Sequence, residues 1–288
     1  MLVTLKEILK QAEDRKIAIG SFNSPDLNSL RAIIDAAEKL DLPVIMQFAE
    51  VHEALTPIDI IGPVMIQEAK KAKVSVCVHL DHGTDMEYLQ KALDMGFTSV
   101  MYDGSTLPFE ENVENTKKAV AMAGKYGASV EAELGSMGRK ESGEGDKTGK
   151  DDETKIYTNP VQAADFVKRT GIDALACSFG TTHGIYLTEP RLDFSVVENV
   201  RKETGGIPVV MHGGSGVSDE DFQKAIAAGV RKINYFTYMD KAGGESSDAY
   251  IKSLEKGMPI FFTSIETAAR EAMQNNLEAA MKVFANLK

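Results

Sequence analysis

Short runs of β-forming residues alternate with amphipathic helical patterns along almost the whole chain of 288 residues. Most of these runs are continuously apolar, as expected for strands that are covered by helices on one side and by a packed interior on the other. The predicted strands are residues 18–23, 44–49, 75–81, 99–103, 129–134, 174–179, 208–212 and 232–236. Eight β–α units in a chain of this length predict an α/β fold, a (β/α)₈ TIM barrel.

We expect one domain, residues 1–288, because no proline-rich or serine-rich linker divides the chain. A doubly wound open sheet is the alternative. That fold usually has fewer strands and a glycine fingerprint after the first one, which the segment SFNSPD lacks. The dipeptides Ser24-Pro25 and Asn159-Pro160 are expected to place a capping residue before a proline in the first turn of a helix.

One connection is unusually long for a compact domain. Residues 136–157, after the fifth predicted strand, are polar and glycine-rich and have no apolar period. Loops of this length are usually functional lids or disordered segments, so we expect a flexible loop over the site, with a disordered surface insertion as the alternative. The last patterns, at about residues 240–287, are helical and could cover the barrel or pack against a second copy.

The composition excludes several classes of partner. The chain has 32 Lys and Arg against 43 Asp and Glu, a net charge of −11, and no basic cluster, so nucleic acid is not expected as a ligand. The N-terminal segment is an amphipathic helical pattern without a signal-peptide core, and no run approaches the ~20 apolar residues of a membrane span. Two cysteines, Cys77 and Cys177, lie in apolar runs, which favours a reducing cytoplasm.

Nearly every predicted strand ends in a polar or ionisable residue. In a (β/α)₈ barrel the carboxyl ends of the strands meet at one rim, where catalytic groups gather. Packing alone does not account for such a set, because buried charges are costly unless they are paired or bound to metal. The set consists of Asn23, Glu50, Asp81, His82, Asp103, Glu133, His183, His212 and Asn234.

Three histidines follow strands closely, and each precedes a glycine. They are His82 in DHG, His183 in THG and His212 in MHGG. A single histidine of this kind is usually a hydrogen-bonded rim residue. Three imidazoles that converge with a fourth position open form a catalytic zinc arrangement, so the three together favour a zinc site.

Two other histidines and a glycine-rich turn lie near this rim. His79 is on the same strand face as Asp81 and is expected to support the site or to be simply buried and hydrogen-bonded. His52 follows the second strand and could be a plain surface residue. The turn MHGGSGVSDED leads from a strand into a capped helix, where backbone N–H groups can hold a phosphate.

Five ordered motifs resemble those of the class II, metal-dependent ketose-bisphosphate aldolases, which include fructose-1,6-bisphosphate and tagatose-1,6-bisphosphate aldolases. The motifs are VHLDHG, EAELG, GTTHGIY, MHGGSG and KIN. The resemblance runs from AIGSFN to about Thr237, most of the chain. It implies reversible aldol cleavage of a phosphorylated ketose, a bisphosphate, with dihydroxyacetone phosphate as the donor.

The resemblance also implies roles for individual residues. His82, His183 and His212 would bind Zn²⁺, which polarises the carbonyl and stabilises an enediolate. Asp81 would exchange a proton with the aldehyde oxygen.

The resemblance implies three further kinds of position: a second cation site, the base that removes a proton from the donor, and the contacts to the donor itself. Asp103 and Glu133 match a second or displaced metal position, and a monovalent cation is also compatible with the family. Glu141 on the long loop would abstract the proton that forms the enediolate, with Glu144 as the alternative. The positions that match the phosphate and ketose contacts are Asn23, Gly184, Gly213, Ser215, Asn234 and Thr237.

The chain departs from the family at several places. The segment YFTY that follows Asn234 is bulkier than usual, and Leu187 stands where many fructose-bisphosphate aldolases have lysine. After the second strand the sequence FAEVHEA replaces a serine- and threonine-rich pattern, so that Glu50 and His52 are expected to face the distal part of the substrate. These changes favour a divergent aldolase and leave the sugar, the aldehyde and the stereochemistry undetermined.

Two alternatives remain open at this point. A Schiff-base aldolase needs a lysine near a strand end, but Lys232 is expected at the start of the last strand, the wrong end. A metal-binding scaffold or partner subunit of another aldolase is the non-enzymatic alternative. The family implies a homo-oligomer, a homodimer or homotetramer, and the sequence does not decide between them.

Overall fold

The computed structural model describes residues 1–135, 157–186 and 190–287. Its strands, all parallel, form a closed barrel of eight, β2 to β9, because β4 pairs with both β3 and β5. The strands are β1 (Leu2–Val3), β2 (Ile19–Asn23), β3 (Val44–Ala49), β4 (Val76–Gly83), β5 (Ser99–Tyr102), β6 (Ser129–Leu134), β7 (Ala174–Cys177), β8 (Val209–Met211) and β9 (Val230–Asn234). The predicted TIM barrel and its eight strands are confirmed.

A short additional strand, β1, was not predicted. It pairs with the amino-terminal end of β4, where Leu2 lies opposite Val76. The amphipathic pattern of the first residues is confirmed as a helix that begins after this strand, at Leu5.

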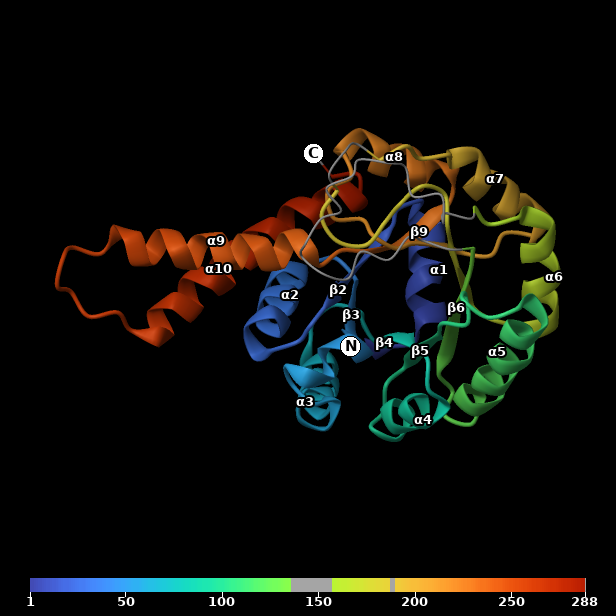
Figure 1. The fold of residues 1–288 in the computed structure, drawn as a ribbon, viewed down its shortest axis with the longest axis horizontal. Coiled ribbons are helices and arrows are strands. Elements are labelled where there is room, and N and C mark those ends of the chain that lie inside the picture. Colours follow the sequence, from blue (N-terminus) through green and yellow to red (C-terminus); the bar gives the residue numbers. More distant parts are fainter. Residues whose placement is uncertain (136–156, 187–189, 288) are drawn as a thin grey trace.

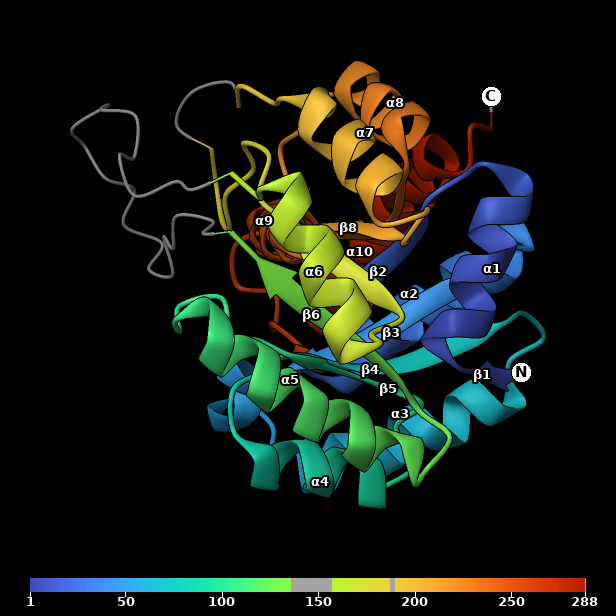
Figure 2. The ribbon, with the colours of Figure 1, turned by 90° about the vertical axis from the view of Figure 1, so that its right-hand side faces the viewer.

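Helices surround the barrel and cover its strands (Figures 1 and 2). They are α1 (Leu5–Arg15), α2 (Leu27–Leu40), η1 (Glu50–Ala54), α3 (Ile58–Lys71), α4 (Met86–Asp94), α5 (Phe109–Gly124), α6 (Pro160–Thr170), α7 (Phe194–Glu203), α8 (Asp219–Ala228), α9 (Thr237–Ser253) and α10 (Phe262–Phe284). Within the described part of the chain, no helix is long and apolar enough to cross a membrane.

The predicted helix caps are partly confirmed. Asn159 caps α6, since its side chain accepts hydrogen bonds from the backbone of Val161 and Gln162. The expectation for Ser24-Pro25 is wrong, because Asp26 caps α2 instead. A carboxylate is at least as good a cap as a hydroxyl, and Asp26 forms a reciprocal pair with Ser29 that fixes the start of the helix.

The last two helices form an arm that projects from the barrel. The arm consists of α9, α10 and the residues 254–261 that connect them, and it extends well beyond the other helices (Figure 1). Its base packs against α2. The helical patterns expected at about residues 240–287 are therefore present, but their outer half does not cover the barrel.

The interior of the barrel holds a buried layer of charge below the rim. The side chains of Lys232, Glu131 and His79 are all fully buried, and Lys232 Nζ lies 2.7 Å from Glu131 Oε2 and 3.3 Å from His79 Nε2. The expected position of Lys232 at the far end of its strand is thus wrong. Lys232 is the third residue of β9 and points into the barrel, where its ammonium group is paired with Glu131.

We predict that Lys232→Ala lowers the free energy of unfolding by about 3–5 kcal/mol, because it leaves the Glu131 carboxylate without its ammonium partner in a dry interior. Guanidinium unfolding followed by circular dichroism measures this loss. The control is Lys224→Ala on the exposed face of α8, which should leave the unfolding midpoint unchanged. An unchanged midpoint in Lys232→Ala would show that the interior pair contributes nothing to stability.

Candidate active site

A cavity of about 390 Å³ opens at the carboxyl ends of the barrel strands. It brings together most of the residues that the sequence singled out, and they come from strands or loops far apart in the chain. The predicted residues that line it are Asn23, Glu50, His52, Asp81, His82, His183, Gly184, Gly213, Ser215, Asn234 and Thr237. Glu141 and Glu144 lie outside the described residues, as does most of the predicted long loop.

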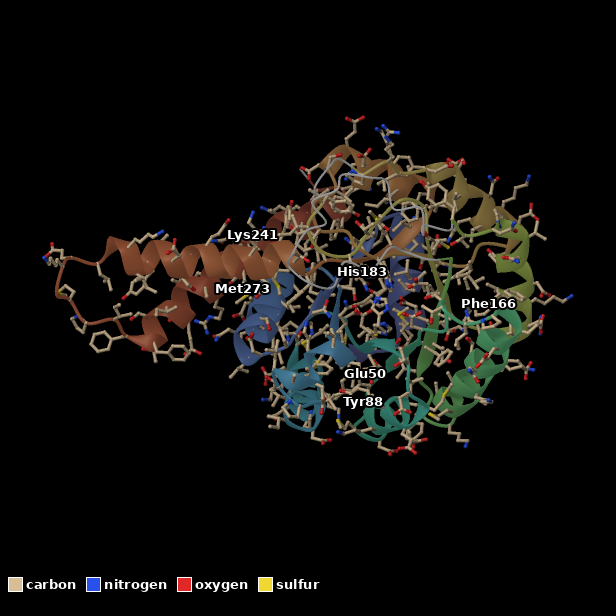
Figure 3. All side chains as sticks on the ribbon, in the orientation of Figure 1. Glu50, Tyr88, Phe166, His183, Lys241 and Met273 are labelled. Atoms are coloured by element: carbon tan, nitrogen blue, oxygen red, sulfur yellow. The ribbon has the colours of Figure 1, made fainter. Side chains whose placement is uncertain are left out.

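Three histidines converge at the centre of this rim. His82 Nε2 lies 3.3 Å from His183 Nε2 and 3.0 Å from His212 Nδ1. Figure 3 shows His183 within the barrel, apart from Lys241 and Met273 on the arm. One nitrogen of each ring lies within 4.8 Å of the others, the arrangement expected of ligands that share one ion.

In two of these rings the outer nitrogen, the one that faces away from the cluster, contacts a carboxylate, and this contact fixes the protonation of the inner nitrogen. His82 Nδ1 lies 2.9 Å from Asp103 Oδ2, and His212 Nε2 lies 2.9 Å from Glu131 Oε1. A carboxylate accepts hydrogen bonds, so in the neutral rings each outer nitrogen carries the proton and the inner nitrogens present lone pairs to each other. Two facing lone pairs at 3.0 Å repel each other unless a proton or a metal ion lies between them, and the donor set fits zinc.

The backbone at His82 is also unusual. Its φ is +49°, in the left-handed region that costs a residue with a Cβ atom. The register of β4 against β5 shifts between Leu80 and Gly83, so this strain lies at an irregular strand end. The distortion turns His82 toward the other two rings, as expected where geometry serves a site rather than stability.

The charges around His82 favour a cation at this position. Burial alone would lower its pKa, but Asp81 and the hydrogen bond to Asp103 outweigh it and raise the pKa of His82 to about 9. Burial and the neighbouring His82 lower the pKa of His212 well below its usual range, so His212 is neutral. The carboxylates thus compensate one positive charge here, which a proton or a metal ion can supply.

Asp103 and Glu133 lie on the β5–β6 side of the histidines. Together with His82 they form a second group whose ligand atoms lie within 4.8 Å of one another. Burial, followed by the charge of Asp103, raises the pKa of Glu133 well above its usual range. Its Oε2 atom is buried and has no hydrogen-bond partner within the described residues, which fits a second position for a cation.

Asp81 lies beside the histidines and is held by two amides. Gln47 Nε2 donates to Oδ2 and Asn234 Nδ2 donates to Oδ1, both at 3.0 Å. Burial alone would raise the pKa of Asp81, but the charges of His82 and His212 lower it, so the carboxyl group is ionised and can accept a proton. The sequence did not single out Gln47, whose only signal was a polar residue inside the apolar strand VIMQFA.

The glycine-rich turn after β8 forms another wall of the cavity. Gly213 has a φ of +66°, and a Cβ atom there would lie 2.3 Å from the carbonyl oxygen of Thr182. Tyr186 donates a hydrogen bond to the Gly213 carbonyl and accepts one from the Thr182 amide, which ties the β7 loop to this turn. Ser218 caps α8, so a capped helix follows the turn, as predicted.

The two remaining histidines, His79 and His52, differ in whether the structure confirms what the sequence predicted for them. His79 is fully buried, and its Nδ1 lies 2.8 Å from Ser99 Oγ, which confirms the alternative of a buried, hydrogen-bonded residue. The surface position allowed for His52 is wrong. Its ring packs edge-on against Phe48 and against Phe236, and it lines the cavity next to Glu50.

Comparisons with known proteins agree with this geometry. The family described as "Fructose-bisphosphate aldolase class-II" matches residues 3–287. The chain is 43% identical over 241 residues to fructose-bisphosphate aldolase of Geobacillus stearothermophilus, covering 82% of this chain and 81% of that protein. It is 37% identical to the uncharacterized protein YdjI of Escherichia coli, over 99% of this chain and 98% of that one.

Solved structures are similar over nearly the whole chain. The crystal structure of the YdjI aldolase from Escherichia coli K12 has a TM-score of 0.86 at 35% identity and covers 99% of this chain and 97% of its own. A putative fructose-1,6-biphosphate aldolase from Coccidioides immitis has a TM-score of 0.82 at 28% identity, with coverage of 97% and 95%. The barrel fold is therefore shared with these proteins.

We predict that the protein binds one zinc ion per chain at the histidine cluster and that His212→Ala loses it, because two remaining imidazoles cannot complete the site. Zinc content after dialysis, measured by inductively coupled plasma mass spectrometry, is the readout. His52→Gln is the control, since it removes a cavity histidine outside the cluster and should retain zinc. Full zinc occupancy in His212→Ala would contradict the assignment.

Proposed function

The chain belongs to the class II fructose-bisphosphate aldolase family, and on that premise we propose that it is a zinc-dependent aldolase acting on a phosphorylated ketose. The donor fragment in this proposal is dihydroxyacetone phosphate. The observation that carries the proposal is the convergence of three histidines with an ionised, amide-held aspartate in one cavity.

The proposed zinc ligands are His82, His183 and His212, and Asp103 with Glu133 provide a second or displaced cation position. When bound, zinc supplies a Lewis acid that stabilises negative charge on the donor fragment. Glu131 and Asp103 hold the His212 and His82 rings in the orientation and tautomer that ligation requires.

In the proposed cleavage, the bond between C3 and C4 of the ketose breaks. The C4 hydroxyl gives its proton to Asp81, and C4 becomes the aldehyde carbon of the product. The electron pair of the broken bond stays on C3, which then takes a proton to give dihydroxyacetone phosphate. We assign that second proton transfer to Glu141 on the grounds of the family resemblance alone.

The donor phosphate is proposed to bind at the turn after β8. Gly213 and Ser215 line the cavity there, in a glycine-rich turn of the kind that can hold a phosphate with backbone N–H groups, and α8 begins a few residues later. Ser215 Oγ also accepts a hydrogen bond from the Phe236 amide at 3.3 Å, which joins this turn to the end of β9. The further proposed donor contacts are Asn23, Gly184, Asn234 and Thr237.

The chemistry can be tested on the donor alone. We predict that the zinc-loaded protein exchanges a hydrogen at the hydroxymethyl carbon of dihydroxyacetone phosphate in deuterated water, observed by NMR. His212→Ala should abolish the exchange, because charge on the donor is no longer stabilised. Asp81→Asn should retain it but lose about 10²–10⁴-fold in cleavage of a ketose phosphate, because its proton transfer occurs at the aldehyde.

The same exchange measurement distinguishes an active aldolase from a metal-binding scaffold protein. Absence of exchange in a protein shown to contain zinc would contradict the aldolase proposal and support the alternative of a metal-binding partner subunit. Loss of exchange in Asp81→Asn would instead move this residue to the donor side. A lysine-dependent mechanism has little support, since within the described residues no lysine lines the cavity and Lys232 is fully buried.

We also propose that the chain forms a homodimer or homotetramer through its arm. The tip of the arm exposes Met258, Ile260, Phe261 and Phe262, each more than half exposed. In a monomer these four large apolar side chains would stay exposed to water as one patch, which is unfavourable and marks a contact surface. A second copy, the partner implied by the family, would cover this tip.

Light scattering coupled to size exclusion tests the arm. Phe261→Asp combined with Phe262→Asp should lower the molar mass to that of a monomer, because it places two charges in the proposed contact. Lys256→Glu, an exposed and polar change at the same tip, is the control and should leave the assembly intact. An unchanged assembly in the double variant would exclude the arm tip from the interface.

The cytoplasm is the proposed location. Cys77 and Cys177 are both buried and unpaired with each other. Burial raises the pKa of Cys77 to about 12, so neither its reactivity nor its position suggests a role in disulfide chemistry.

A further inference from the structure

The cavity has two ends on either side of the histidines. The donor end is the turn at Gly213 and Ser215, after β8. The acceptor end, which we define by Glu50, His52 and Thr84, lies at the ends of β3 and β4. Asp81 on β4 pairs with Ala49, the last residue of β3, and Glu50 follows directly, so an aldehyde whose oxygen meets Asp81 extends toward the acceptor end.

The acceptor end contains a carboxylate and, among the residues that the structure describes, neither lysine nor arginine. Across residues 1–135, 157–186 and 190–287, neither Lys nor Arg contributes to the cavity lining. Glu50 is half-buried, and its Oε2 accepts hydrogen bonds from the Thr84 amide at 3.2 Å and from the Thr84 hydroxyl at 3.4 Å. These contacts fix its negative charge at the acceptor end, where it repels a phosphate and accepts hydrogen bonds from hydroxyl groups.

His52 supplies a second polar group at this end without supplying charge. Its side chain is only 9% exposed, and its ring centroid lies 5.0 Å from that of Phe236. Burial lowers the pKa of His52, which keeps the imidazole neutral. Its Nδ1 is buried without a hydrogen-bond partner among the described residues, while the ring as a whole lines the cavity beside Glu50.

The two ends differ in the backbone that borders them. At the donor end the glycine-rich turn after β8 lines the cavity through Gly213 and Ser215, and a turn of this kind can hold an anion with backbone N–H groups. The ten-residue helix α8 begins only after this turn and carries Asp219, Glu220 and Asp221 in its first turn, so the turn itself is the anion position. At the acceptor end the corresponding element is η1, a 3₁₀ helix of five residues that begins with the carboxylate-bearing Glu50 itself. The cavity therefore has one end suited to an anion and one end that disfavours it.

We propose that the aldehyde partner is an uncharged polyhydroxy aldehyde and that the ketose substrate carries a single phosphate, on its donor half. The inference rests on the proposed aldolase function and departs from the bisphosphate that the family resemblance implies. Glu50 and His52 are its specificity residues, and they bind hydroxyl groups of the aldehyde. The bond-breaking step is the same as for a bisphosphate, because the second phosphate, which this substrate does not carry, takes no part in that step.

The test compares two acceptors in the condensation direction. The zinc-loaded protein is given dihydroxyacetone phosphate with either glyceraldehyde or glyceraldehyde 3-phosphate, and kcat/KM is measured for each aldehyde. We expect glyceraldehyde to be preferred by about tenfold or more, the discrimination that one like-charge contact provides. The readout is the ratio of the two kcat/KM values. A loss of activity that affects both aldehydes equally does not change this ratio.

Variants of Glu50 assign the preference to this residue. Glu50→Gln should reduce the ratio, and Glu50→Lys should shift it by about tenfold or more toward the phosphorylated aldehyde. Glu87→Lys is the matched control. It makes the same charge change at an exposed position in the first turn of α4, outside the cavity, and should leave the ratio as in the wild type.

The outcomes distinguish this inference from the proposed function. Absence of donor exchange in deuterated water contradicts the aldolase function itself. Donor exchange together with a preference for glyceraldehyde 3-phosphate contradicts only the uncharged acceptor. A preference for glyceraldehyde that persists unchanged in Glu50→Lys would remove Glu50 from the specificity residues and overturn the assignment.

Discussion

The carboxylate of Glu131 is the contact on which the rest of the site depends. It is fully buried in the barrel, with one oxygen 2.7 Å from the ammonium of Lys232 and the other 2.9 Å from the outer nitrogen of His212. The first contact compensates its charge in a dry interior, and the second fixes the tautomer of a histidine at the rim. The Lys232–Glu131 pair inside the barrel thereby determines that Nδ1 of His212 presents its lone pair to the cluster.

The rim above this layer concentrates acidic side chains around the histidines. Asp81, Asp103 and Glu133 surround the three histidines, and all three carboxyl groups are buried. Such a group of acids destabilises a fold unless a cation joins it. The pKa values of His82 and Glu133 are both raised and express the same shortage of positive charge, since each group favours the state with a proton bound.

The barrel and most of the rim follow from sequence because they depend on local patterns. Continuous apolar runs identify strands, and parallel strands bring their carboxyl ends together whatever the details of packing. Contacts between strands do not follow in this way. Gln47, which holds Asp81, and His52, which packs on Phe236, depend on neighbours that are distant in sequence, so their strands alone gave no indication of either partner. The arm was visible as helices, but its projection depends on α2 at its base.

Chemistry and specificity occupy different strands in this barrel. The histidines and Asp81 belong to β4, β8 and the loop after β7, and they are fixed from below by Glu131 and from the side by Gln47 and Asn234. Glu50 and His52 follow β3 and contact neither Glu131 nor the histidine cluster in any hydrogen bond described above. The segment after β3 can therefore change the aldehyde that is accepted without disturbing the metal ligands or the proton transfer. The sequence FAEVHEA after β3 is one of the places where the chain departs from the family pattern, and under the proposed function it would alter the sugar while the proposed catalytic residues stay the same.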